Sequence, residues 1–212
     1  MELDHVLVAT TDLARAAREF ESRWGLASVE GGRHPAWGTA NRIVPLDTHY
    51  LELIAVVDPE TSATQAHGRW VAAHATPSGR PFAWAVRTDD VEEVAARLDL
   101  AVSDGSRVTP LGAVLRWRSA GIDRAIAEPS LPFFIQWAAD AALPGTSPVS
   151  HPVGGAAVSE LRLEGDPERV GGWLGTGGRD LPVVVRPGPG AVAAVVLRTD
   201  AGEIFLGEPD QG

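Results

Sequence analysis

The chain repeats one short unit three times, in which an aspartate follows an apolar, strand-like run and opens a helical pattern. The aspartates are Asp12, Asp90 and Asp166, and they lie 78 and 76 residues apart. An aspartate at this place accepts hydrogen bonds from the free N–H groups of the first helical turn. Repeated strand–helix units predict a fold of paired sheets, with a functional site where the copies face each other. The repeat itself names no substrate.

The first unit is expected to span residues 1–57 in the order β-α-β-β-β. Its helix carries an apolar stripe from Leu13 to Phe20 and ends at Gly25, as a helix closed by glycine does. A glycine-rich loop is expected over residues 31–41. The expected strands are residues 3–10, 27–30, 42–46 and 50–57.

The rest of the chain divides into a connector, a second unit, a linker and a third unit. A helix is predicted at 63–75 in the connector, and a Pro-, Gly- and Ser-rich linker at 144–155. Several glycines weaken the helical pattern of the third unit, which is expected to cover or extend the sheet without forming a second site. The predicted boundaries are 58–80 for the connector, 81–143 for the second unit and 156–209 for the third unit.

We therefore predict an α+β fold, in which paired βαβββ units form a curved mixed-sheet cleft with a third partial unit beside it. In the second unit the strands are expected at 82–88, 114–119 and 133–138, with a turn at 120–123. Pairing within one chain is favoured because a short linker raises the effective concentration of the two units. A homodimer stays possible.

Composition excludes several classes of function. The net charge of −10 argues against nucleic acid as a partner, because phosphate binding needs a basic face. All 18 basic residues are arginine and no cysteine is present, which excludes Schiff-base lysines, disulfides and thiolate catalysis. No apolar stretch reaches the roughly 18 residues of a membrane span, and the acidic start of the chain does not resemble a signal peptide. A cytoplasmic protein with a small-molecule ligand is expected.

Three motifs carry a resemblance to a known group of proteins. They are the first strand Leu3-Asp4-His5-Val6-Leu7-Val8, the segment from Gly31-Gly32-Arg33-His34-Pro35 to Gly38-Thr39-Ala40-Asn41, and Tyr50-Leu51-Glu52-Leu53-Ile54-Ala55. With the βαβββ units, they resemble the vicinal oxygen chelate superfamily, which includes glyoxalase I-like, bleomycin-resistance-like and extradiol dioxygenase proteins. The closer resemblance is to the glyoxalase-like domain family.

This resemblance implies a cleft whose metal ligands come from the first and last strands of the two units. The corresponding positions here are His5, Glu52, Ala83 and Gln136. Since Ala83 cannot bind a metal, the candidate ligands are His5, Glu52 and Gln136, for one divalent Zn, Fe, Ni or Mn ion. Such an ion would polarise a carbonyl or enediolate oxygen. Alternatively, no metal binds, and His5 and Glu52 simply satisfy each other inside the cleft.

His34 is the candidate catalytic residue, because an imidazole at the cleft mouth can act as a general base near neutral pH. Asn41 and Arg42 are candidates for fixing a carboxylate or carbonyl group of the substrate. Among the seven tryptophans, Trp37 and Trp84 are candidates for lining the cleft, although filling the core explains such rings equally well.

Strand alternation places Gln136 and Trp137 on opposite faces, so a Gln136 that points into the cleft would turn Trp137 away. The other histidines lie in predicted turns, the connector or the linker and are expected to be solvated: His49, His67, His74 and His151.

Two functions follow. The first is a glyoxalase-like small-molecule enzyme of the lyase, isomerase or oxygenase type, possible with or without a metal. The second is a metal-free protein that binds or sequesters a small molecule, as bleomycin-resistance-like proteins do. The glycine-rich segment lacks the lysine of a phosphate-binding loop, and no GxSxG motif supports a serine nucleophile.

Overall fold

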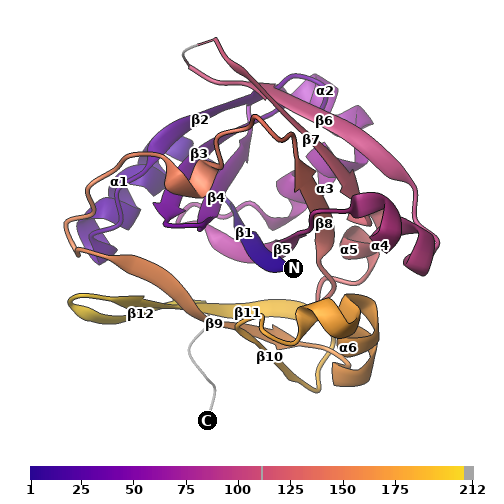
Figure 1. The fold of residues 1–212 in the computed structure, drawn as a ribbon. Coiled ribbons are helices and arrows are strands. Elements are labelled where there is room, and N and C mark those ends of the chain that lie inside the picture. Colours follow the sequence, from indigo (N-terminus) through magenta and orange to yellow (C-terminus); the bar gives the residue numbers. More distant parts are fainter. Residues whose placement is uncertain (111, 208–212) are drawn as a thin grey trace.

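A computed structural model describes residues 1–110 and 112–207, and the strands of this described part form two separate sheets (Figure 1). Eight strands close into a barrel in the order β1-β4-β3-β2-β6-β7-β8-β5. They are β1 (Glu2–Ala9), β2 (Val29–His34), β3 (Thr39–Leu46), β4 (His49–Val56), β5 (Arg80–Arg87), β6 (Val102–Val108), β7 (Val114–Ala120) and β8 (Phe133–Trp137).

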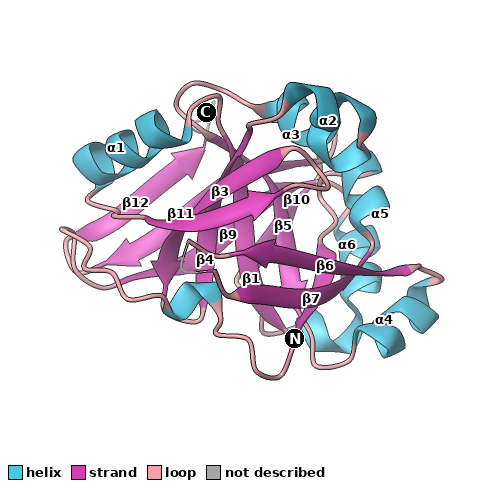
Figure 2. Cartoon of the chain, turned by 90° about the horizontal axis from the view of Figure 1, so that it is seen from above, coloured by secondary structure: helices cyan, strands magenta, loops and turns pink. Residues whose placement is uncertain are grey.

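The remaining strands of the described chain form a sheet of four in the order β10-β9-β11-β12. They are β9 (Ala156–Glu164), β10 (Val183–Arg186), β11 (Ala191–Thr199) and β12 (Gly202–Gly207). Viewed from above, α1 lies on one side of the strands and the other helices lie on the opposite side (Figure 2). The helices are α1 (Leu13–Trp24), α2 (Pro59–Thr64), α3 (Ala66–His74), α4 (Val91–Leu98), α5 (Ile122–Ala127) and α6 (Pro167–Leu174), with short 3₁₀ turns at Pro144–Thr146 and Gly175–Gly178.

The three repeated aspartates all cap helices, as the sequence predicts. The side chain of Asp12 accepts a hydrogen bond from the backbone N–H of Arg15 at 2.9 Å, at the start of α1. Asp90 accepts from the N–H of Glu93 at 2.9 Å before α4, and Asp166 caps α6 in the same way. These bonds satisfy N–H groups that have no partner inside the helix.

The two complete units meet within one chain and close into a barrel, where the sequence predicted a cleft. The strands β1 and β5 pair antiparallel along their length. On the other side, β2 and β6 pair where Arg33 lies opposite Val108. The α+β class with mixed sheets is confirmed, since β1 with β4 and β5 with β8 are parallel pairs. The closed barrel, however, encloses its interior more completely than a cleft would.

Four local predictions are corrected. The glycine-rich segment expected as a loop contributes strand β2 and the start of β3. The single connector helix is two helices, α2 and α3, separated at Gln65, whose backbone is extended. Strand β6 and helix α5 were not predicted, and α5 lies where a turn was expected.

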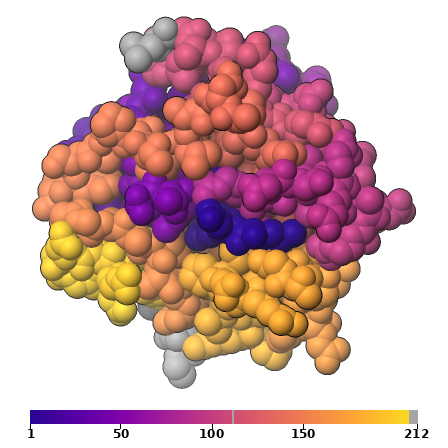
Figure 3. Space-filling model, in the orientation of Figure 1, coloured from indigo at the N-terminus to yellow at the C-terminus, as the bar shows by residue number. Residues whose placement is uncertain are grey.

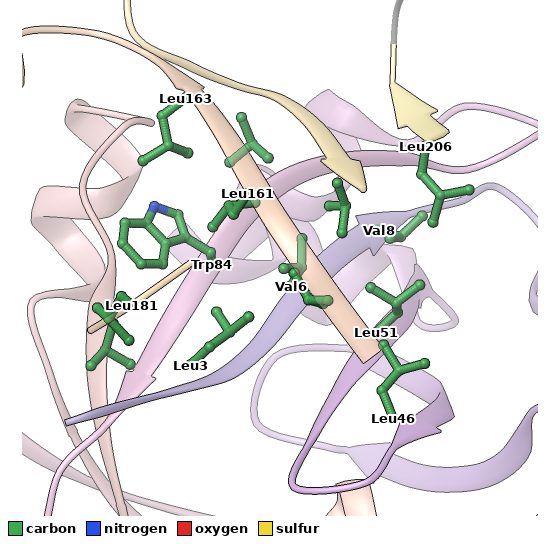
Figure 4. Close-up of a cluster of buried hydrophobic side chains, with 14 of the residues drawn as sticks. Leu3, Val6, Val8, Leu46, Leu51, Trp84, Leu161, Leu163, Leu181 and Leu206 are labelled. Carbon is green, nitrogen blue, oxygen red and sulfur yellow. The ribbon is translucent and has the colours of Figure 1, made fainter. Parts of the chain in front are cut away.

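The C-terminal sheet covers the outer face of β1, β4 and β5. Figure 3 shows this C-terminal part, in orange and yellow, lying directly against the barrel. Apolar side chains of β1 and β4, such as Val6 and Leu51, share one core with Leu161 and Leu163 of β9 (Figure 4). The third unit keeps the β-α-β-β-β order, but β9 lies between β10 and β11. In the first unit, by contrast, β1 pairs with β4.

The linker between the barrel and this sheet is fastened by His151, which was expected to be solvated. Its Nδ1 accepts a hydrogen bond from the N–H of Ala27 at 3.0 Å, while Nε2 lies 2.7 Å from the carbonyl oxygen of Pro45. A neutral ring protonated at Nε2 satisfies both groups. No helix in the described residues is long and apolar enough to cross a membrane.

Candidate functional site

A small cavity of about 40 Å³ lies inside the barrel and gathers most of its buried polar side chains. Alternation along the strands explains this, because every second residue points inward. On β4, Tyr50 and Glu52 face the cavity while Leu51 and Leu53 pack against the C-terminal sheet. The polar side chains that line the cavity are His5, His34, Asn41, Tyr50, Glu52, His67 and Arg107.

A bulge in β1 places two consecutive polar residues where they contact each other. The pairing of β1 with β5 skips Asp4, since Leu3 lies opposite Val86 and His5 opposite Ala85. An extra residue in one strand bends it and re-aims the neighbouring side chains. Both side chains are buried, and Nδ1 of His5 lies 2.6 Å from the Asp4 carboxylate. Asp4 thus fixes the imidazole ring of His5.

The other nitrogen of His5 points toward Glu52. Nε2 of His5 lies 3.4 Å from Oε2 of Glu52, and Asn41 Nδ2 donates a hydrogen bond to Oε1 at 2.5 Å. Burial raises the pKa of Glu52, but His5, His34 and the Asn41 hydrogen bond outweigh it and leave the pKa below its ordinary value. Glu52 is therefore a buried, ionised carboxylate that Asn41 and His5 hold in place.

His34 lies on β2 and is buried, rather than in a loop at the mouth of a cleft. Its Nδ1 lies 3.1 Å from the hydroxyl of Thr39. Among the described residues, none forms a hydrogen bond with its Nε2. Burial lowers the pKa of His34. The carboxylate of Glu52 acts to raise this pKa, whereas Arg107 and His5 act to lower it. The lowered pKa favours the neutral ring, and in the tautomer whose Nδ1–H donates to the hydroxyl of Thr39, Nε2 can accept a proton.

Three polar cavity residues, Tyr50, Arg107 and His67, were missed at the sequence level. Arg107 of β6 is buried, and its Nη1 donates to the carbonyl oxygen of Gly31. His67 of α3 was expected to be solvated, yet it is 8% exposed and both ring nitrogens lack a hydrogen-bond partner. Burial lowers its pKa to about 4. Nothing in the sequence around His67 signals this, because α3 does not show a clean apolar stripe.

The structure brings together five of the eight predicted site residues: His5, His34, Trp37, Asn41 and Glu52. Oδ1 of Asn41 has no hydrogen-bond partner and is buried. The indole of Trp37 lies 5.4 Å from the ring of His34 and 4.3 Å from that of His67, between ring centroids.

Three predicted residues lie elsewhere, and their expected places are corrected. Gln136 faces outward, where its amide donates to the carbonyl of Asp89 and accepts from the N–H of Val91 at 3.3 Å. Because adjacent residues of a strand point to opposite faces, Trp137 points into the cavity. Arg42 donates to Ser28 on the outside of the barrel.

Trp84, the third, lies in the core between the barrel and the C-terminal sheet (Figure 4). Its Nε1 donates a hydrogen bond to the carbonyl oxygen of Ser130 at 3.1 Å. It points to the same side as Val6, its partner across the β1–β5 pair, and so away from the cavity.

Comparison with known families gives a match over residues 3–176 to the glyoxalase-like domain family. The chain belongs to this family. This is the family to which the three sequence motifs showed the closer resemblance. A search of proteins with curated functions finds no match.

Solved structures are similar to this glyoxalase-like protein to different degrees. A hypothetical protein from Staphylococcus aureus is 16% identical with a TM-score of 0.70, over 93% of this chain and 91% of that one. A variant of the Streptomyces coelicolor methylmalonyl-CoA epimerase, in complex with 2-nitronate-propionyl-CoA, is 18% identical with a TM-score of 0.44, over 66% of this chain and 97% of that one. The Mycobacterium tuberculosis methylmalonyl-CoA epimerase is 16% identical with a TM-score of 0.44, over 64% of this chain and 85% of that one.

The resemblance of the three sequence motifs implies a divalent metal ion, but the donor set here does not fit one. A catalytic metal usually has three protein ligands. In the described residues, no three His, Cys, Asp or Glu side chains are grouped to hold an ion. Gln136 lies outside, Ala83 is apolar, and the guanidinium of Arg107 lines the same cavity as His5 and Glu52. A cation beside Arg107 would be repelled.

Proposed function

We propose that this glyoxalase-like protein is a small-molecule enzyme of the lyase or isomerase type, which moves a proton in the barrel cavity without a metal. The observation that carries this proposal is that a buried His34, whose Nδ1 is held by Thr39, lines the same small cavity as the buried carboxylate of Glu52. A neutral imidazole and a fixed carboxylate are the parts that proton abstraction needs.

In this mechanism His34 acts as the general base. Nε2 accepts a proton from a carbon next to a substrate carbonyl, and the positive charge on the ring is stabilised by the carboxylate of Glu52. Asp4 and His5 hold Glu52 in place from behind, through the 2.6 Å and 3.4 Å contacts. Return of the proton to another carbon gives isomerisation, and loss of a leaving group gives elimination. Lyase or isomerase chemistry is favoured over oxygenation because the donor set does not fit a metal.

Buried polar atoms without hydrogen-bond partners are evidence that the cavity binds a polar ligand. Oδ1 of Asn41 and both ring nitrogens of His67 are buried without hydrogen bonds, and buried polar groups normally have partners. A substrate would satisfy them. The same atoms would also serve a protein that only binds its ligand, so turnover distinguishes the two functions.

The test is proton exchange in D₂O, with a panel of small carbonyl compounds followed by NMR. We expect deuterium to enter beside the carbonyl group, and His34→Gln to slow this by a factor of about 10² or more. His74→Gln is the matched control, since His74 does not line the cavity, and it retains exchange. Chelation is expected to leave the rate unchanged.

The opposite results are equally informative. Exchange abolished by a chelator and restored by one divalent ion would contradict the metal-free mechanism. Saturable binding of a compound without exchange of any panel member would favour the binding protein over the enzyme.

A further inference from the structure

The guanidinium of Arg107 is a buried charge without an opposite charge beside it. Arg107 is 6% exposed, and its one hydrogen bond goes to the neutral carbonyl of Gly31. Among the described residues, no carboxylate lies within ion-pair distance of it, whereas Arg87, Arg118 and Arg169 each pair with a glutamate. A buried charge is costly unless it is paired. Arg107 itself therefore lacks a direct anionic partner in the described part of the chain.

The acid already in the cavity does not supply that partner. Both oxygens of Glu52 have partners, with Asn41 on Oε1 and His5 near Oε2. A guanidinium carries five N–H donors in a planar fork, and Arg107 uses one nitrogen on Gly31. The donors that remain match the two oxygens of a carboxylate.

We infer that the ligand of this cavity is a small carboxylic acid, whose carboxylate pairs with Arg107 and whose apolar part lies against Trp37. The inference rests on the proposed function for its site and names the substrate class. The cavity of about 40 Å³ suits a planar, singly charged group, since one water takes about 10–15 Å³ by this measure. A doubly charged phosphate beside Glu52 would meet stronger repulsion.

The apolar part has a second space to occupy. A neighbouring hollow of about 420 Å³ shares Trp37, His67 and Ile122 with the cavity. It is lined by apolar residues, such as Leu100 and Ile126, and also by polar ones, among them Asp99, Asp104, Asp123 and Arg124. A ligand anchored at Arg107 would extend between these shared side chains into the hollow. On that path it passes the unpartnered ring nitrogens of His67, which would bind a polar group beside the carboxylate.

The experiment compares phenylacetate, its uncharged amide phenylacetamide and inorganic phosphate by quenching of tryptophan fluorescence. We expect saturable binding of the acid, binding of the amide at least tenfold weaker, and no effect of phosphate. Arg107→Gln should remove the preference for the acid, and Arg107→Lys should restore part of it. Arg33→Gln is the matched control, because Arg33 is exposed on the adjacent strand β2.

Several results would overturn the inference: no saturable binding of phenylacetate, equal binding of acid and amide, phosphate binding as tight as that of the acid, or a preference for the acid that survives in Arg107→Gln. If Arg107→Gln does not fold, Arg107→Lys decides: a preference for the acid as large as that of the wild type would overturn the inference, because lysine keeps the charge but lacks the planar fork. If acid binding depends on Arg107 but no proton exchange occurs, the enzyme proposal is contradicted and the proposal of a carboxylic acid ligand is supported. If proton exchange depends on His34 but acids are not preferred, the enzyme proposal is supported and the proposal of a carboxylic acid ligand is contradicted.

Discussion

At the scale of single residues, Gly31 makes room for two polar groups of the site. A side chain at this position would place its Cβ 2.1 Å from Oδ1 of Asn41 and 3.0 Å from Nη1 of Arg107. Neither group is free to move, since Asn41 holds Glu52 and Arg107 bonds the carbonyl of Gly31 itself. The absent side chain of Gly31 is thus part of the site's construction.

We expect Gly31→Ala to lower the free energy of unfolding by about 1–3 kcal/mol, the usual cost of overpacking a filled interior. It should also displace Asn41 from Glu52 and weaken ligand binding. Denaturant unfolding monitored by circular dichroism measures the first effect. A variant as stable as the wild type, with unchanged binding, would show that the side chain of Asn41 moves away at little cost.

His67 gives a pH dependence whose sign follows from its pKa. Burial lowers this pKa from 6.5 to about 4, so between these values the unfolded chain holds more protons than the folded one. Stability is complete above pH 6.5 and falls as the pH is lowered toward 4. A difference of this size corresponds to on the order of 3 kcal/mol.

The prediction is that His67→Gln reduces the loss of stability between pH 6.5 and pH 4 by about this amount. Unfolding free energies at a series of pH values provide the measurement. His74→Gln, on the same helix, is the control and should keep the wild-type slope. Identical slopes for wild type and His67→Gln would mean that His67 is not the buried neutral histidine described above.

At the scale of elements, strong local patterns were predictable from the sequence and non-local pairing was not. The capping aspartates Asp12, Asp90 and Asp166 mark helix starts because capping is decided within a few residues. The pairing of Arg33 with Val108, which closes the barrel, joins residues far apart in sequence and leaves no local periodicity. Strand β6 escaped detection because it is rich in polar residues and glycine.

In the site, too, local patterns were predictable from the sequence and features that depend on strand pairing were not. The motifs around His5 and Glu52 located the two residues that contact each other. Alternation correctly placed Gln136 and Trp137 on opposite faces, but which one faces inward depends on packing against other elements. The bulge at Asp4 and the inward position of Arg107 depend on the pairing partners of their strands. Those partners are visible only in three dimensions.

Helix α6 is weakened by glycines that nothing in the fold requires. A Cβ at Gly171 or Gly172 would meet no atom within 4 Å, and both residues lie inside the helix. Glycine in a helix costs roughly 0.5–1 kcal/mol relative to alanine. We expect Gly171→Ala to raise the free energy of unfolding by up to about this amount. A control is Gly105→Ala, where the Cβ would lie 2.3 Å from the indole of Trp117 and destabilisation is expected.

Denaturant midpoints of the two variants test this contrast directly. A stabilised Gly105→Ala, or a Gly171→Ala that destabilises by more than about 1 kcal/mol, would contradict the packing described for these strands and helices.

At the scale of the whole molecule, one core joins the barrel to the C-terminal sheet. Side chains on the outer face of the barrel, such as Val6 and Trp84, pack with Leu161 and Leu197 across the two sheets. Trp173 of α6 also donates a hydrogen bond to the carbonyl of Pro132 at 2.9 Å. Neither sheet therefore buries its apolar face alone, and the two should fold as one cooperative unit.

We expect Leu161→Ala to destabilise the entire protein by about 2–5 kcal/mol, as the removal of a fully buried leucine does. Val184→Ala on β10 is the control, because Val184 is 42% exposed and should change stability by less than about 0.5 kcal/mol. Hydrogen exchange resolved by strand provides the deciding measurement. Protection should fall by the same free energy in β1 and β5 as in β9 and β11, since the core they share loses the same contacts. Loss of protection confined to β9 to β12, with the barrel strands unchanged, would show that the barrel is stable without its C-terminal cover.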